Sequence, residues 1–206
     1  MGTLKLKRTL ICGSSEYSKS LLFESAVHWS ELGHKVVFIQ VNQMTALPIP
    51  IDGAKPPSVQ ALNRITFLTL SSWQDLVQYT SSIHETSPIV PHVILVSDLH
   101  NYYSNEDLNQ SLLAHMLCAC LCDVMEYCSR VNNSETFLVV TTKDTELETK
   151  KLSTIYFPLN TWTSVVKQEE LELTKTLLNF QNTNIKIKFL LFNNKIRCDS
   201  IEKLYV

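Results

Sequence analysis

The sequence predicts an α/β fold in which a mostly parallel central sheet is followed by antiparallel C-terminal strands. Short runs of β-branched and aliphatic residues alternate with segments of helical periodicity over the first two thirds of the chain, as in sheets buried on both faces. The chain is expected to be β-rich from about residue 153, because apolar and polar residues alternate within 162–174 and 184–192, which is typical of half-exposed antiparallel strands. With 206 residues and no clear internal boundary, we expect a single domain over residues 1–206.

The first forty residues predict one strand–helix–strand unit. Residues 4–12 are expected to form a strand, and the apolar positions after residue 20 recur at helical spacing until Gly33 ends the helix. Residues 35–41, KVVFIQV, are a nearly continuous apolar run of β-branched type. Such a run is typical of a strand that is buried on both faces of a parallel sheet.

The rest of the chain divides into elements by the same criteria. Residues 44–57 hold four of the seven prolines and are expected to form a loop. Ser72 with Asp75, and Ser104 with Asp107, are spaced as capping residues that start two helices, the second of them long. Further strands are expected at residues 64–70, 93–96 and 137–141, within 162–174 and 184–192, and at 196–205.

Composition excludes several classes of protein. Apolar residues make up 45% and charged residues 18% of the chain, so it is globular rather than disordered. The net charge of -2 gives no general attraction to nucleic acid, so any DNA contact must come from a local patch or a partner. The longest apolar stretch, residues 112–122, is shorter than the roughly 18 residues that span a bilayer. No membrane partner is therefore expected.

No zinc or other metal site is predicted in this chain. Cys118, Cys120 and Cys122 alternate along an expected helix, where only Cys118 and Cys122 share a face. The histidines show no ligand spacing. The six cysteines are too few and too clustered for a disulfide framework, which fits a reducing compartment.

One motif carries chemistry, a degenerate P-loop between the first strand and the first helix. Four residues separate Gly13 from Ser18, Lys19 and Ser20, where an intact loop has Gly, Lys and Ser or Thr. In such a loop, backbone N–H groups surround the phosphates, the lysine reaches the β- and γ-phosphates and the hydroxyl holds magnesium. We expect Gly13, Ser14, Ser18, Lys19 and Ser20 to bind ATP and magnesium weakly. The alternative is a polar strand-to-helix turn with an N-cap.

Together with this motif, several segments make the chain resemble the SWIM-domain-associated ATPase subunits of animal Shu-type complexes, which are divergent RecA-type recombinase paralogues. These segments are residues 21–23 (LLF), 44–48 (MTALP), 93–103 and 156–162. The resemblance implies a RecA-like P-loop core, a SWIM zinc-finger protein as obligate partner and a nuclear location. It also implies a role in homologous recombination DNA repair, in which the complex binds single-stranded DNA and promotes or stabilises assembly of the strand-exchange recombinase.

The resemblance also implies residues that this chain lacks. The acidic residue that activates the attacking water should follow the second strand, where Asn42 stands, and the glutamine that senses the γ-phosphate should fall near Thr142 or Lys143. The Walker B aspartate is expected at Ser97 or Asp98, and we favour Asp98. Loss of the general base lowers the rate roughly a hundredfold to ten-thousandfold, whereas loop strain costs about 1–3 kcal/mol of binding. Hydrolysis is therefore expected to be more impaired than binding.

A local excess of basic residues lies on the C-terminal strands, away in sequence from the acidic residues 169–172. Lys186, Lys188, Lys195 and Arg197 alternate with apolar residues, which places them along one face. A solvated sheet face is the common interpretation of such a pattern. The other is a surface that contacts single-stranded DNA, and these four residues are the DNA-binding candidates.

Two other functions stay open. A small P-loop kinase or NTPase needs a catalytic carboxylate and an arginine-bearing lid near the phosphates, and the four arginines of this chain are not clustered. A nucleotide-free scaffold of P-loop descent would differ from the recombinase paralogue only in nucleotide occupancy and partners, which the sequence does not separate.

Overall fold

The computed structural model describes residues 7–86, 90–104, 109–143, 146–158, 160–176, 183–193 and 195–205. Its strands are β1 (Arg8–Cys12), β2 (Val36–Gln40), β3 (Ile65–Thr69), β4 (Val93–Val96), β5 (Phe137–Thr142), β6 (Thr161–Lys167), β7 (Glu170–Thr176), β8 (Thr183–Phe192) and β9 (Lys195–Tyr205). Its helices are α1 (Ser15–Glu31), α2 (Val59–Leu62), α3 (Trp73–Thr86), the 3-10 helix η1 (Leu99–Tyr102), α4 (Gln110–Val131) and α5 (Glu146–Tyr156).

The described strands belong to one sheet in the order β3-β2-β4-β5-β1-β6-β7-β8-β9. From β3 to β6 the neighbours pair in parallel, and from β6 to β9 they pair antiparallel. β6 joins the two parts, because Thr161 lies opposite Leu10 of β1. The predicted α/β class, with a mostly parallel sheet and antiparallel C-terminal strands, is confirmed.

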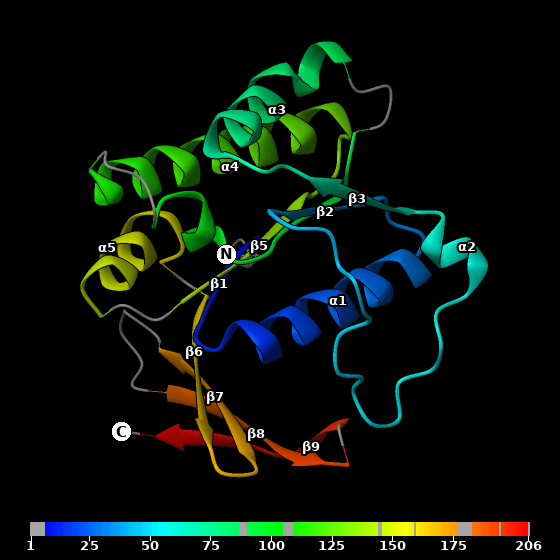
Figure 1. The fold of residues 1–206 in the computed structure, drawn as a ribbon, viewed down its shortest axis with the longest axis vertical. Coiled ribbons are helices and arrows are strands. Elements are labelled where there is room, and N and C mark those ends of the chain that lie inside the picture. Colours follow the sequence, from blue (N-terminus) through cyan, green and yellow to red (C-terminus); the bar gives the residue numbers. More distant parts are fainter. Residues whose placement is uncertain are drawn as a thin grey trace.

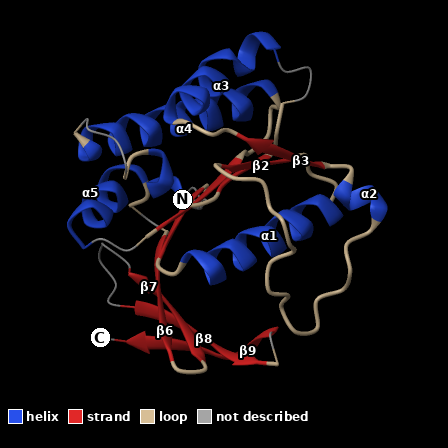
Figure 2. Ribbon diagram, in the orientation of Figure 1, coloured by secondary structure: helices blue, strands red, loops and turns tan. Residues whose placement is uncertain are grey.

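Helices cover both faces of the parallel part (Figures 1 and 2). α3, α4 and α5 lie on one face, where Leu117 and Leu121 of α4 belong to the same buried cluster as Leu10, Ile94 and Val140 of the strands. Burial on both faces explains why the central strands β2 and β4 are apolar at nearly every position; all their residues are buried.

The antiparallel part curves around α1, so that this helix lies between two portions of the same sheet (Figure 1). Toward the parallel strands, α1 buries Leu22 and Ala26 with Phe38 of β2. Toward the antiparallel strands, it places Tyr17 and Leu21 against a cluster that comprises Leu171, Leu173, Phe189 and Ile196. Both packed sides hold the start of α1 at a fixed position relative to the ends of the parallel strands.

Several element boundaries differ from the sequence prediction. α4 begins at Gln110 rather than near Ser104, because Asn109 caps it by accepting a hydrogen bond from the N–H of Leu112 at 3.2 Å; Asp107 lies outside the described residues. Neither α2 nor α5 was predicted, and α5 extends past residue 153, where the β-rich portion was expected to begin. The first antiparallel strand begins at Thr161, one residue before its predicted start. The expected run 162–174 is a hairpin, with a turn at Gln168, whose φ is 54°.

α4 is long and apolar enough to cross a membrane by length and composition alone. Half of its most apolar 18-residue stretch, however, is buried inside the fold. Its buried face includes Leu113, Leu117, Leu121 and Met125, which pack in the same cluster as residues of α3 and the sheet. The core therefore accounts for the apolar character of this helix.

Candidate functional site

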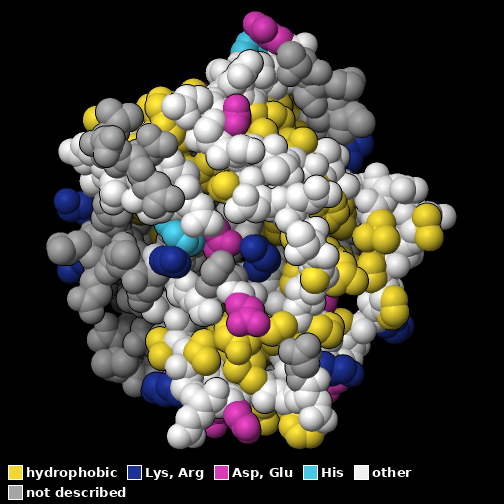
Figure 3. Space-filling view, viewed as in Figure 1, with side chains coloured by type: hydrophobic (Ala, Val, Ile, Leu, Met, Phe, Trp, Pro, Cys, Tyr) yellow, Lys and Arg dark blue, Asp and Glu magenta, His cyan; other side chains and the backbone are white. Residues whose placement is uncertain are grey.

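Polar side chains gather where β1, β4 and β5 reach their carboxyl ends. These strands are parallel neighbours, so the residues that follow them come out at the same edge of the sheet, which is where α/β folds place their ligands. They are Gly13 after β1, Ser97 and Asp98 after β4, and Lys143 after β5. Figure 3 shows a histidine, an acidic side chain and two basic side chains close together near the middle of this face.

Gly13 makes the turn from β1 into α1. Its N–H donates to the carbonyl of Thr142 at 2.9 Å, and its φ is 147°. A Cβ atom at this position would overlap the side chain of Ser164 and lie 2.5 Å from the Ser164 carbonyl oxygen. Only glycine fits here, because both the backbone conformation and the close approach of β6 exclude a side chain.

The segment between Gly13 and Ser20 is not a wide loop. α1 begins at Ser15, and the N–H of Ser18 donates to the carbonyl of Ser14 at 3.1 Å, so the expectation of a phosphate-wrapping loop through Ser18 is wrong. Without the second glycine nothing opposes a helical turn, and Glu16 in the first turn is favourable beside the helix N-terminus. The side chain of Ser14 makes no capping hydrogen bond, so the first-turn N–H groups lack a side-chain cap.

Lys19 and Asp98 meet at this edge of the sheet. Lys19 Nζ lies 3.5 Å from Asp98 Oδ2, and the side chains are 36% and 6% exposed. Asp98 has a left-handed backbone, with φ 55°, which aspartate tolerates better than most residues. Its N–H donates to Thr141 Oγ1 at 2.8 Å, and its Oδ2 accepts from Ser97 Oγ at 3.1 Å. Of the two Walker B candidates, Ser97 and Asp98, only Asp98 has a carboxylate, and this carboxylate faces Lys19.

Ser18 and Ser20 are turned into the protein. Both are 1% exposed. Ser20 Oγ donates to the carbonyl of Glu16 at 3.3 Å, while Ser18 Oγ, like Ser164 Oγ, is buried with no hydrogen-bond partner among the described residues. The structure thus brings Gly13, Ser14, Lys19 and Asp98 to the site and directs the other two predicted hydroxyls elsewhere.

His100 is a member of the site that sequence reasoning missed. The N–H of Lys143 donates to His100 Nδ1 at 3.2 Å, which ties η1 to the end of β5. Burial lowers the pKa of His100, although the charge of Asp98 opposes that shift. The hydroxyl of Tyr103 lies 3.4 Å from Thr142 Oγ1, in a second contact between the same segments. No sequence signal marks these pairs, because their partners lie about forty residues apart.

The positions expected to carry catalytic groups hold none. Asn42 follows β2 and is exposed, and β5 ends in Thr142 and Lys143. An amide does not accept the proton of an attacking water. Gln40, at the end of β2, is 3% exposed, and its Oε1 has no partner among the described residues. The site therefore holds a partly exposed lysine beside the start of α1, without a general base at the predicted position.

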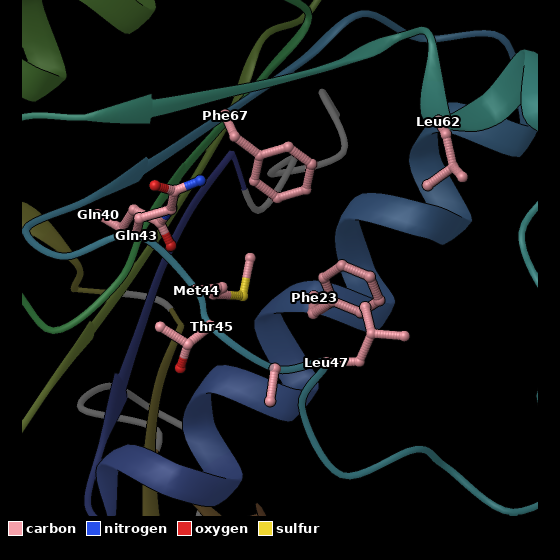
Figure 4. A pocket seen from close by; sticks show the side chains of 9 residues that line it. Phe23, Gln40, Gln43, Met44, Thr45, Leu47, Leu62 and Phe67 are labelled. Atoms are coloured by element: carbon pink, nitrogen blue, oxygen red, sulfur yellow. The ribbon is translucent and has the colours of Figure 1, made fainter.

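A groove of about 410 Å³ lies one helical turn beyond Lys19 (Figure 4). Gln40, Gln43 and Thr45 lie toward one end, and Phe23, Leu47, Leu62 and Phe67 toward the other, with Met44 between them. No charged side chain lines this groove, so it offers no cation to pair with a phosphate. Phe23 lines this groove and Ala26 is fully buried. Both side chains of α1 therefore pack against neighbouring residues of the fold.

The basic residues of the C-terminal strands are mostly paired with carboxylates. Lys186 lies 2.8 Å from Glu172, Lys188 lies 2.9 Å from Glu202, and Lys195 lies 3.6 Å from Asp52, each measured from Nζ to the nearer carboxylate oxygen. Arg197 is exposed and has no ion pair among the described residues. The acidic residues 169–172, distant in sequence, are thus brought close, since Glu172 lies opposite Lys188 in the β7–β8 pair.

No described group of three His, Cys, Asp or Glu side chains is arranged to hold a metal ion. Cys118 and Cys122 lie in the core with α4, and burial raises the pKa of both thiols. A raised thiol pKa disfavours the thiolate, which is the form that binds metals. The described residues of this chain therefore offer no zinc site.

Comparisons with known proteins identify the fold. No protein-family profile matches the chain, and no curated protein matches its sequence. Among solved structures, the crystal structure of the RadB recombinase is similar with a TM-score of 0.60 and 15% identity. The match covers 94% of this chain and 90% of that one. The chain shares its fold with this recombinase.

Proposed function

We propose that this chain is a recombinase-paralogue subunit that supports homologous recombination DNA repair by binding rather than by rapid ATP hydrolysis. The observation that carries the proposal is the pairing of Lys19 with Asp98 at the carboxyl edge of a RecA-type sheet. The positions expected to supply the base and the γ-phosphate sensor hold Asn42, Thr142 and Lys143. The fold and phosphate-binding features are thus present without the groups that speed hydrolysis.

Weak nucleotide binding follows from the same features. Lys19 is partly exposed and can reach an anion, and the side chain of Ser14, the N-cap residue of α1, leaves the first-turn N–H groups without its hydrogen bond. The opposing features are Glu16 in the first turn and the short connection of Gly13 and Ser14. Because both features oppose phosphate binding, a nucleotide-free scaffold is the second candidate function. The helical conformation of residues 15–20 favours this scaffold.

A kinase is disfavoured by where the arginines lie. Arg8 pairs with Glu126 of α4 at 3.8 Å, and Arg64 donates to the carbonyl of Gln60. Arg130 lies in the last turn of α4, and Arg197 lies on β9. None of the four follows β1, β4 or β5 at the carboxyl edge, so none is placed as a lid residue beside the phosphates.

The need for a partner is supported by the exposed apolar surface near α2. Leu47 is 82% exposed, and Phe67 and Leu62 are about 40% exposed; apolar side chains gather on this side in Figure 3. Contiguous apolar surface of this kind marks interaction sites in soluble proteins. We propose a SWIM zinc-finger protein as the stable partner, with a strand-exchange recombinase as the protein assisted, in the nucleus.

Single-stranded DNA is proposed to bind mainly to the complex. The chain has a net charge of -2, and three of its four candidate residues are paired with carboxylates. Arg197 is the best remaining phosphate contact. Long-range attraction for DNA must therefore come largely from the partner.

Purification of the tagged full chain from cells, with identification of the bound proteins and measurement of zinc, tests this function. A zinc-binding SWIM protein in stoichiometric amount is the expected result. A matched tagged chain with Leu47→Asp and Phe67→Asp should lose that protein if the apolar surface holds it. Purification of the unmodified chain without any such partner would contradict the proposal.

A further inference from the structure

The carboxylate of Asp98 is already committed within the protein. Its Oδ2 lies 3.5 Å from Lys19 Nζ and accepts a hydrogen bond from Ser97 Oγ at 3.1 Å. The side chain is only 6% exposed. A magnesium ion keeps several of its waters when it binds through one carboxylate, and a carboxylate this enclosed leaves little room for them. The ammonium at the same oxygen would also repel the metal ion.

The second expected magnesium ligand is also turned away. Ser20 is 1% exposed, and its hydroxyl donates to the carbonyl of Glu16 at 3.3 Å, within α1. A hydroxyl that is bonded back to its own helix does not point at the carboxyl edge of the sheet. The residues that a P-loop protein uses for magnesium, a hydroxyl after the lysine and a Walker B carboxylate, therefore do not fit the ion here.

The groups suited to an anion are, in contrast, accessible. The side chain of Lys19 is 36% exposed, and Ser14, the N-cap residue of the 17-residue helix α1, makes no side-chain hydrogen bond to the first-turn N–H groups. The only described carboxylate within ion-pair distance of Lys19 is Asp98. A phosphate that approaches Lys19 must share the ammonium with that carboxylate, and the negative charge of Asp98 repels it.

We propose that this site takes a phosphate-bearing anion without magnesium, and that Asp98 acts as an internal competitor for Lys19. The inference rests on the proposed function, since it names the form of the ligand at the same site. In the absence of ligand, the Lys19–Asp98 pair occupies the site. In its presence, Lys19 turns to the phosphate and Asp98 keeps its bonds to Ser97 and Thr141.

Calorimetric titration of the full chain with ATP and with pyrophosphate, in EDTA and in magnesium chloride, tests this inference. Asp98→Asn removes the competing charge, so the affinity for metal-free ATP should rise about tenfold, the scale of one charged hydrogen bond. Asp199→Asn on exposed β9 makes the same charge change away from the site and is the control. Lys19→Met should abolish binding, whereas Lys35→Met at the opposite end of the sheet should not.

Ser20→Ala supplies a second test that changes the fold little. Because the Ser20 hydroxyl is bonded to Glu16, its loss should change the affinity for ATP in magnesium by less than twofold. If magnesium instead raises the affinity of the unmodified chain tenfold, and Asp98→Asn or Ser20→Ala abolishes that gain, the inference is overturned while nucleotide binding stands. If neither the unmodified chain nor Asp98→Asn binds ATP or pyrophosphate, the inference and the proposed nucleotide site both fail.

Discussion

Gly13→Ala should destabilise the fold more than any other glycine substitution among the described residues. The new Cβ would lie 2.5 Å from the Ser164 carbonyl oxygen and overlap the Ser164 side chain, in a residue whose φ is 147°. Overpacking costs about 1–3 kcal/mol, and an unfavourable backbone conformation costs a further 1–2 kcal/mol or so. The expected loss is therefore about 2–5 kcal/mol, a large part of the roughly 5–15 kcal/mol that stabilises a typical domain.

Gly53→Ala is the matched control, because Gly53 has a φ of 81° but nothing within 4 Å of its added Cβ. It should lose only the backbone contribution, about 1–2 kcal/mol. Urea unfolding followed by circular dichroism measures both variants. Ser164→Gly in the Gly13→Ala background should restore part of the loss, since the side-chain overlap disappears and the carbonyl contact stays. Equal stability of Gly13→Ala and Gly53→Ala would refute the close approach of β6 to the start of α1.

Three further predictions concern pH, DNA and the partner surface. Burial lowers the pKa of His92 and of His100 from 6.5, so below about pH 6.5 the unfolded chain binds protons that the folded chain does not, and the free energy of unfolding should fall. In urea unfolding at pH 7.5 and 5.5, His100→Gln should show a smaller pH dependence than the unmodified chain; an equal dependence would exclude His100 as a contributor. Arg197→Ala should lower the slope of log affinity against log salt concentration by about 0.7 for single-stranded DNA binding by the proposed partner complex. Lys188→Ala should change that slope less, because the Lys188 ammonium is held by Glu202. The reverse order would assign the DNA contact to Lys188. Leu47→Ser should leave stability within about 0.5 kcal/mol, because Leu47 is 82% exposed, yet weaken capture of the partner in a pull-down; unchanged capture would place the partner elsewhere.

The parallel part of the fold could be predicted because its strands have little freedom. Runs such as VVFIQ in β2 and VILV in β4 are buried at every position, so no other arrangement hides them. α5 could not be predicted in this way, since most residues of ELETKKLSTIY are polar. The start of α4 was misplaced because Ser104 and Asp107 have the spacing of a cap, while Asn109 performs that role.

The site could be predicted only where a local motif marked it. Lys19 came from its spacing to Gly13, and Asp98 from the end of a buried strand, and the structure places the two 3.5 Å apart. The bond between His100 and Lys143 depends on β4 and β5 being neighbours, which no local pattern encodes. The pairing of Lys186 with Glu172 depends likewise on the register of β7 and β8.

Steady-state ATP hydrolysis by the full chain, alone and with the proposed zinc-finger partner, tests most directly whether the site lacks efficient catalysis. A typical enzyme turns over about ten times per second, and loss of a general base removes about a thousandfold, the middle of the usual range. We predict a rate below about 0.01 per second that Lys19→Ala does not measurably change. A rate of about one per second or more that Lys19→Ala abolishes would contradict the proposed binding role and require a catalytic base that the described site does not contain.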